Sequence, residues 1–120
     1  MFGLLKKAPA RFRKSFGYAW DGFKAAFAKE ESFRLEMIAF CLLAAGLCLV
    51  SWPPWKKIAL GACFILVPMA EMFNSAIEDV CDLVTLDPSP RIKSAKDKGA
   101  LAVLFAIVVN AGVLAALLLA

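Results

Sequence analysis

The sequence reads Glu71-Met72-Phe73-Asn74-Ser75-Ala76-Ile77-Glu78-Asp79-Val80-Cys81-Asp82 at the end of a long apolar run that begins near Ile58. At about 100° per residue, one helical stripe collects the polar side chains Glu71, Asn74, Glu78 and Asp82. Acids aligned in this way repel one another unless a cation lies among them. The alternative is a helix that leaves the membrane here, so that its acids simply meet water. Glu71 argues against that alternative, because apolar residues continue for another turn beyond it. An ionisable group at such a place is by default a functional candidate.

The composition around this stretch is that of a membrane protein. The chain has 120 residues, room for one domain (1–120), and its hydrophobic fraction is 62%. The net charge of +4 does not indicate a nucleic-acid partner, because the basic residues flank apolar segments and so fit lipid headgroups. The chain has no histidine, which excludes His-based catalysis. Its four cysteines show no CxxC spacing, and we expect neither a disulfide nor a thiolate metal site.

The amino-terminal part, residues 9–31, is predicted to be an amphipathic helix in the membrane interface. Aromatic side chains recur on one face at helical spacing, namely Phe12, Phe16, Trp20, Phe23 and Phe27. Pro9 suits the start of this helix. A cleavable signal peptide is the competing interpretation, but no A-x-A-like site follows the first long apolar stretch, which begins only after Glu36.

Three further helices are predicted to span the membrane, at residues 35–52, 57–82 and 95–120. Pro68 is expected to bend the second span. Ser94 and Asp97 resemble a capping box that opens the third. Asn110 is the only strongly polar side chain of that span, and we expect it to form an interhelical hydrogen bond rather than to act in catalysis. The fold class is therefore an all-α membrane protein with one interfacial and three transmembrane helices.

The basic residues predict the orientation of these helices. With the amino terminus in the cytoplasm, all 14 Lys and Arg residues except Lys56 and Lys57 lie on the cytoplasmic side. The ten acids lie on that side as well. The chemistry of this protein is therefore expected at the cytoplasmic face.

Carboxylates from separate helices, together with lysine and arginine, are what a magnesium-nucleotide site needs. Mg²⁺ takes hard oxygen ligands, often one or two carboxylates plus phosphates. Lysine and arginine neutralise the charge of the phosphates in phosphoryl transfer. The sequence contains neither a GxxxxGK[ST] P-loop nor a kinase GxGxxG loop, so an ATP site here would be of another kind. Taken alone, Lys96-Asp97-Lys98 and Glu30-Glu31 would be solvated surface.

Three blocks of the sequence resemble the small bacterial integral-membrane diacylglycerol kinases. The first is Glu71-x-x-Asn74-Ser75-Ala76-Ile77-Glu78-x-x-x-Asp82 and the second is Ala95-Lys96-Asp97-Lys98-Gly99-Ala100. The third is Gly17-Tyr18-Ala19-Trp20-Asp21-Gly22, followed by Ala25-Ala26, Glu30 and Phe33-Arg34. The resemblance covers residues 11–108 without an evident gap.

The resemblance implies ATP-dependent phosphorylation of a membrane lipid alcohol, with diacylglycerol giving phosphatidic acid and with Mg²⁺ as cofactor. It makes Glu71 the general base and Glu30 and Glu78 the metal carboxylates. The ATP-binding residues that it implies are Arg11, Tyr18, Glu30, Asn74, Glu78, Asp87, Ser89, Lys96 and Asp97, with Asp82 a polar neighbour of the metal. The lipid-binding residues that it implies are Arg11, Trp20, Lys24, Ser32, Arg34, Glu36, Glu71 and Ala100. It further implies a homotrimer with shared active sites in the bacterial inner membrane.

One departure and two alternatives bear on this function. The family often carries Glu-Tyr-His in its second cytoplasmic loop, and here Asp87-Pro88-Ser89 stands in that place, which puts the adenine or ribose contacts in doubt. Undecaprenol kinase, a branch of the same family, is the alternative enzyme. A small membrane transporter is the alternative from another class, but a transporter would place its acid near the midplane of the bilayer.

Overall fold

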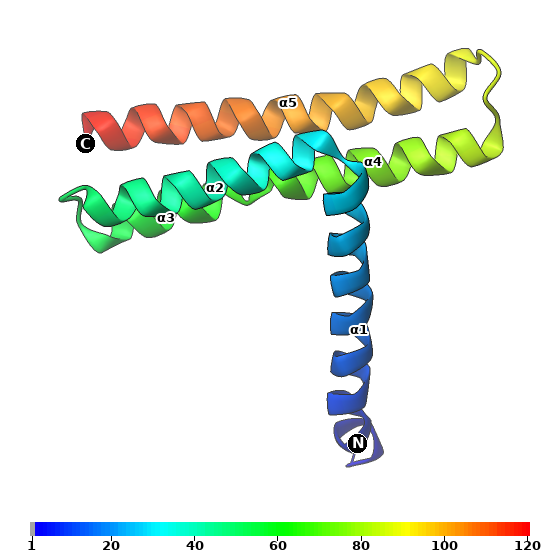
Figure 1. Ribbon diagram of the computed structural model, residues 1–120, viewed down its shortest axis with the longest axis horizontal. Coiled ribbons are helices and arrows are strands. Elements are labelled where there is room, and N and C mark those ends of the chain that lie inside the picture. The colour runs from blue at the N-terminus through cyan, green and yellow to red at the C-terminus, as the bar shows by residue number, and fades with distance from the viewer. Residues whose placement is uncertain (1) are drawn as a thin grey trace. The chain divides into compact units, whose positions relative to one another are not determined.

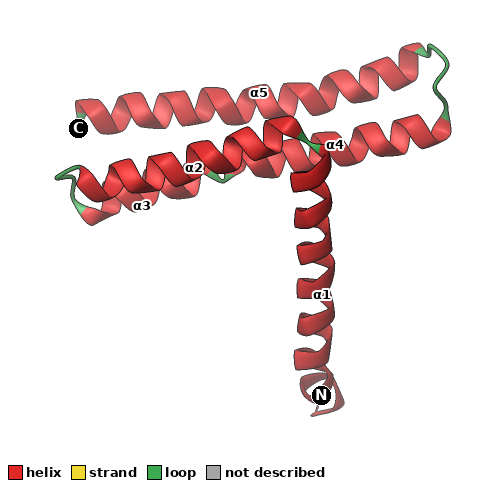
Figure 2. Ribbon diagram, viewed as in Figure 1, coloured by secondary structure: helices red, strands yellow, loops and turns green. Residues whose placement is uncertain are grey.

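The computed structural model describes residues 2–120, and side chains from residue 7 onward, and this part of the chain is all helical. The helices in chain order are α1 (Phe2–Lys29), α2 (Glu31–Leu49), α3 (Pro54–Phe64), α4 (Leu66–Val84) and α5 (Pro90–Leu119). Figure 2 shows that the remaining residues form short connections between these helices. The all-α fold expected from the sequence is therefore confirmed.

Three segments are long and apolar enough to cross a membrane, as the sequence predicted. They are Glu31–Leu49, Pro54–Val84, which contains α3 and α4, and Pro90–Leu119. Their apolar side chains face outward, for example Leu42 and Phe105, which are 69% and 62% exposed. In water such exposure would oppose folding, whereas hydrocarbon solvates these side chains. The interfacial position of α1 and the trimer remain predictions.

Two predicted helix starts are wrong. Pro9 lies inside α1 rather than at its start, because the helix already begins at Phe2. Likewise α5 begins at Pro90, with Ser89 at the cap, so Ser94 lies inside the helix and opens nothing. Proline fits the first helical position, where its missing N–H leaves no bond unmade, and this advantage outweighs the capping-box pattern further along.

The second predicted span is interrupted between α3 and α4, three residues before Pro68, where the sequence predicted a bend. Ile65 separates the two helices, and its N–H contacts the carbonyl oxygen of Cys63. Because proline has no N–H, the carbonyl of the residue four positions earlier, Phe64, loses its helical donor. The interruption falls where that bond is lost.

The chain divides into two compact units, of which the first ends at Arg34 and the second is Leu35–Ala120. In the first unit, Phe23 stacks on Trp20 and Phe27, with ring centroids 5.5 and 5.9 Å away, and meets Phe33 edge-on at 5.6 Å. Arg34 donates to the carbonyl oxygens of Phe27 and Ala28 at 3.0 and 3.2 Å. It thus satisfies carbonyls that the end of α1 leaves without helical donors.

In the second unit, α5 returns along α4 and α3 (Figure 1), and two polar contacts hold it there. Asn110 of α5 donates to the carbonyl oxygen of Cys63 in α3 at 3.0 Å, which confirms the expected interhelical hydrogen bond. At the far end, buried Lys56 donates to the carbonyl oxygens of Leu117 and Ala120 at 3.0 and 2.8 Å. These contacts fix the register of α5, and therefore which of its residues face the acids of α4.

Candidate active site

The acidic stripe of α4 lies against the first turns of α5. The side-chain amide of Asn74 donates to Glu78 Oε1 at 3.0 Å, as expected for residues one turn apart on one face. One turn further, Lys96 of α5 donates to Asp82 Oδ1 at 2.6 Å. The structure thus brings together the block that ends at Asp82 and the block that contains Lys96.

A glycine allows the two helices to approach at this point. Gly99 is buried, and a Cβ atom built there would collide with the side chain of Asn74 and lie 3.4 Å from its Cα. Asn74 Oδ1, which faces Gly99, is buried and has no hydrogen-bond partner. Because Gly99 has no Cβ, the Asn74 side chain has room for the orientation in which its amide donates to Glu78.

Glu36 and Glu71 also come together, although they lie on different predicted spans. Their carboxyl groups are close enough for their charges to interact, and Glu36 Oε2 is buried without a hydrogen-bond partner. Glu36 lines a pocket of about 380 Å³ that also includes Asn110 of α5, and we call it the Asn110 pocket. The proposed general base and one proposed lipid-binding residue are therefore neighbours.

A second pocket, of about 300 Å³, lies where the connection from α4 meets α5. It is lined by the charged and polar residues Asp82, Thr85, Asp87, Ser89, Lys93, Lys96 and Asp97, with Leu86, Pro88 and Ile92. Lys93 pairs with Asp97 at 2.5 Å. Four residues that the resemblance assigns to ATP, namely Asp87, Ser89, Lys96 and Asp97, thus line one pocket. We regard it as the candidate nucleotide pocket.

The remaining candidate residues except Ala100 belong to the first unit, so their approach to Glu71 stays a prediction. Within that unit Tyr18 and Trp20 are exposed, by 73% and 53%, and Arg11 and Ser32 are exposed as well. Lys24 pairs with Asp21 at 2.8 Å, while the guanidinium of Arg34 contacts the end of α1 as described. In the second unit, Ala100 follows Gly99 and is exposed.

The carboxylates present can be tested against the expected Mg²⁺. Among residues 7–120 no three Asp, Glu or Cys side chains gather closely enough to hold a metal by themselves. Mg²⁺ is usually held by only one or two carboxylates together with substrate phosphates and water. Glu78 is exposed beside Lys96 and offers hard oxygen to such an ion. The donor set fits a magnesium ion that arrives with ATP, whereas a permanent all-protein site would need more ligands.

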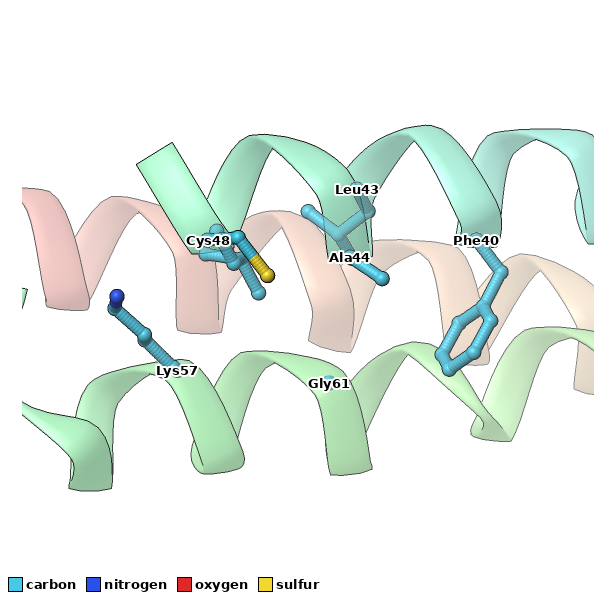
Figure 3. A pocket seen from close by; sticks show the side chains of 7 residues that line it. Phe40, Leu43, Ala44, Cys48, Lys57 and Gly61 are labelled. Carbon is cyan, nitrogen blue, oxygen red and sulfur yellow. The ribbon is translucent and has the colours of Figure 1, made fainter. Parts of the chain in front are cut away.

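Sequence reasoning missed the role of Lys56 and the pocket next to it. Lys56 was expected only as one of two basic residues on the side opposite the cytoplasm. The structure buries it at the end of α5, with its ammonium 5.6 and 5.7 Å from the ring centroids of Trp52 and Trp55. A lysine between two interfacial tryptophans was the available signal. Figure 3 shows the nearby pocket of about 280 Å³ between α2 and α3, with Lys57 at one end and Phe40 at the other.

Residues 17–118 match the family described as prokaryotic diacylglycerol kinase. The chain is similar to the diacylglycerol kinase of Escherichia coli K12, with 36% identity over 99 residues that cover 82% of this chain and 81% of that protein. The diacylglycerol kinase of Pseudomonas aeruginosa is 33% identical, over 82% and 80% of the two chains. That of a Sinorhizobium species is 38% identical, over 72% and 63%.

Proposed function

Because this chain belongs to the prokaryotic diacylglycerol kinase family, we propose that it transfers the γ-phosphoryl group of ATP to the hydroxyl of a membrane lipid alcohol, 1,2-diacylglycerol in the first place. One observation in the second unit carries this proposal. The stripe of α4 that bears Glu71, next to Glu36, also bears Asp82, which pairs with Lys96 of α5. Membership of a kinase family leaves no support for the transporter.

Glu71 is the proposed general base. A carboxylate in reach of the lipid hydroxyl accepts its proton as the oxygen attacks the γ-phosphorus, and the bond from that phosphorus to the ADP oxygen breaks. Glu36 lies within electrostatic range of Glu71 and is proposed to contact the lipid beside the base.

Lys96 is the proposed phosphate ligand from the protein. Its ammonium lies 2.6 Å from Asp82 Oδ1 and within electrostatic range of Glu78. These two carboxylates hold the long and flexible side chain of Lys96 in place. The candidate nucleotide pocket, which Lys96 lines together with Asp87 and Ser89, accepts the remainder of the nucleotide. Glu78, joined by Glu30 of the first unit, would hold Mg²⁺, which supplies positive charge to the β- and γ-phosphate oxygens.

The homotrimer and the cytoplasmic orientation are part of the same proposal. Glu78 and Asp82 are exposed in the isolated chain, although both belong to a helix of a predicted span. A charge at membrane depth is expensive, and a neighbouring protomer could shelter these acids and bring its own α1 over them. The excess of Lys and Arg on one side of the spans favours the orientation in which this site faces the cytoplasm. The inner membrane is proposed from the family.

The test is ATP-dependent incorporation of labelled phosphate into lipid by the purified chain in detergent micelles with Mg²⁺. Diacylglycerol and undecaprenol are offered separately, and wild type is compared with Glu71→Gln, which is nearly isosteric but cannot accept the proton. We expect labelled phosphatidic acid and at least a ~10²-fold lower rate for Glu71→Gln. Asp79→Asn serves as a matched control on the same helix, because Asp79 lies off the acidic stripe. Labelling of undecaprenol alone would transfer the proposal to the polyprenol, and labelling of neither lipid would refute it.

A further inference from the structure

The break between α3 and α4 lies close to the proposed general base. α3 ends at Phe64, α4 begins at Leu66, and Glu71 lies early in α4. The last carbonyl groups of a helix lack helical donors and need partners from elsewhere, above all in the hydrocarbon of a membrane. A side chain that donates to a carbonyl at this break can therefore hold the break in one geometry.

The side chain of Asn110 reaches the break from α5. Its nitrogen donates to the carbonyl oxygen of Cys63, in the last turn of α3, at 3.0 Å, and to that of Ala106 in its own helix at 2.9 Å. Its oxygen is buried without a hydrogen-bond partner. A leucine would fill a similar space in an apolar span and leave no polar atom unpaired. The feature that an asparagine adds here is therefore the bond that it donates to Cys63.

α5 passes the break as an uninterrupted helix (Figure 1). On one side of the break it contacts α4, where Gly99 meets Asn74. On the other side it contacts α3, through Asn110 and, at the far end, through Lys56. Of these contacts, the bond from Asn110 lies at the break itself. It therefore joins the end of α3 to the same helix on which α4 packs.

Glu36 approaches Glu71 from the α3 side of the break. Phe40, one turn along α2 from Glu36, meets Phe64 at the end of α3, with ring centroids 5.7 Å apart. Glu36 is near enough to Glu71 for their charges to interact. Because α2 packs on the end of α3 whereas Glu71 belongs to α4, the geometry of the break determines how these two carboxyl groups lie relative to each other.

Building on the proposed function, we infer that Asn110 is a positioning residue for the reaction. Its amide holds the break between α3 and α4 in one geometry, and so places Glu71, the proposed base, relative to Glu36, which is proposed to contact the lipid. Without the bond to Cys63 the break takes up other angles, and only a fraction of the molecules has the two carboxyl groups in place. Pro68 acts together with Asn110, because it removes the N–H that would close the helix across the break.

Distances between spin labels test the role of Asn110 at the break without any use of enzyme activity. Nitroxides are attached at Ile58 of α3 and Val80 of α4, both exposed, in a cysteine-free full chain in detergent micelles. Labelled chains are diluted with unlabelled ones, so that only the distance within one chain is measured. We expect Asn110→Leu to broaden or shift the distance distribution, and the matched control Val109→Leu, at an exposed neighbour, to leave it unchanged. An Asn110→Leu distribution equal to that of wild type would overturn the inference.

A double-mutant cycle in kcat tests the connection to Glu71. Asn110→Leu should lower kcat for 1,2-dioleoylglycerol by about 2- to 10-fold, the value of one net hydrogen bond, with KM for ATP unchanged. Pro68→Ala restores the missing N–H and should close the break, so it lowers kcat itself and leaves Asn110→Leu little further effect in that background. A side chain that merely packs α5 on α3 would cause the same loss in both backgrounds, and that result would overturn the inference.

The two measurements separate this inference from the proposed function. An active wild type whose kcat does not depend on Asn110 refutes the inference alone. A wild type that phosphorylates neither diacylglycerol nor undecaprenol refutes the proposed function and with it the role of Asn110 in the reaction, while the label distances still decide whether Asn110 holds the break.

Discussion

Gly99→Ala should damage the packing of α5 on α4 at the acidic stripe. The added Cβ would collide with the Asn74 side chain, and its nearest backbone neighbour, Asn74 Cα, lies at an ordinary 3.4 Å. The side chain rather than the helix must therefore move, and in moving it gives up its hydrogen bond to Glu78.

The expected magnitude follows from a control on the same helix. A Cβ built at Gly112 meets nothing within 4 Å, so Gly112→Ala should stabilise the protein by the ~0.5–1 kcal/mol of helix propensity. Gly99→Ala gains the same amount but bears an overpacking penalty of about 1–3 kcal/mol. Its free energy of unfolding should fall below that of Gly112→Ala by this penalty. The lost bond to Glu78, if it supports catalysis, should lower kcat up to about tenfold.

The assay is a double-mutant cycle with Asn74→Ala, read by thermal unfolding in micelles and by the kinase rate. In the Asn74→Ala background the collision is gone, so Gly99→Ala should become as harmless as Gly112→Ala, and the coupling energy should be about 1–3 kcal/mol. If Gly99→Ala has the same effect with and without Asn74, or is harmless throughout, the reasoning from the close approach is refuted.

Three further predictions concern the ends of the molecule and the metal. Lys56→Met should lower the unfolding midpoint in micelles, because it leaves the carbonyl oxygens of Leu117 and Ala120 without their charged donor. The expected loss in the free energy of unfolding is about 1.5–3 kcal/mol. If Lys56→Met is as stable as the matched control Lys57→Met, this prediction is contradicted. Glu30→Gln and Glu78→Gln should each raise the Mg²⁺ concentration for half-maximal rate, and unchanged values in both would remove them as ligands. Trp20→Ala should raise KM for lipid more than KM for ATP, since its aromatic face is proposed to set the depth of α1; the reverse order would place α1 at the nucleotide.

The sequence by itself determined the helical class, the three spans and the identity of the acidic stripe. Apolar runs long enough to cross a bilayer allow only helices with internally paired backbones, and the 3.6-residue period then places Asn74 and Glu78 side by side without any tertiary information. Family membership likewise follows from the sequence blocks alone. The sequence did not determine the start of α5, because a proline at the first helical position and a capping box are competing signals. The helix begins at Pro90 and not at the capping box of Ser94.

Only the tertiary structure decided which groups from different helices meet. The register of α5 sets Lys96 beside Asp82, Gly99 against Asn74, and Asn110 at the carbonyl oxygen of Cys63. It also buries Lys56 at the end of α5 and leaves Glu36 Oε2 and Asn110 Oδ1 buried without a hydrogen-bond partner. Sequence periodicity orders residues around one helix axis, but it carries no information on how far a neighbouring helix slides along that axis. That displacement is set by side-chain packing and polar pairing between helices.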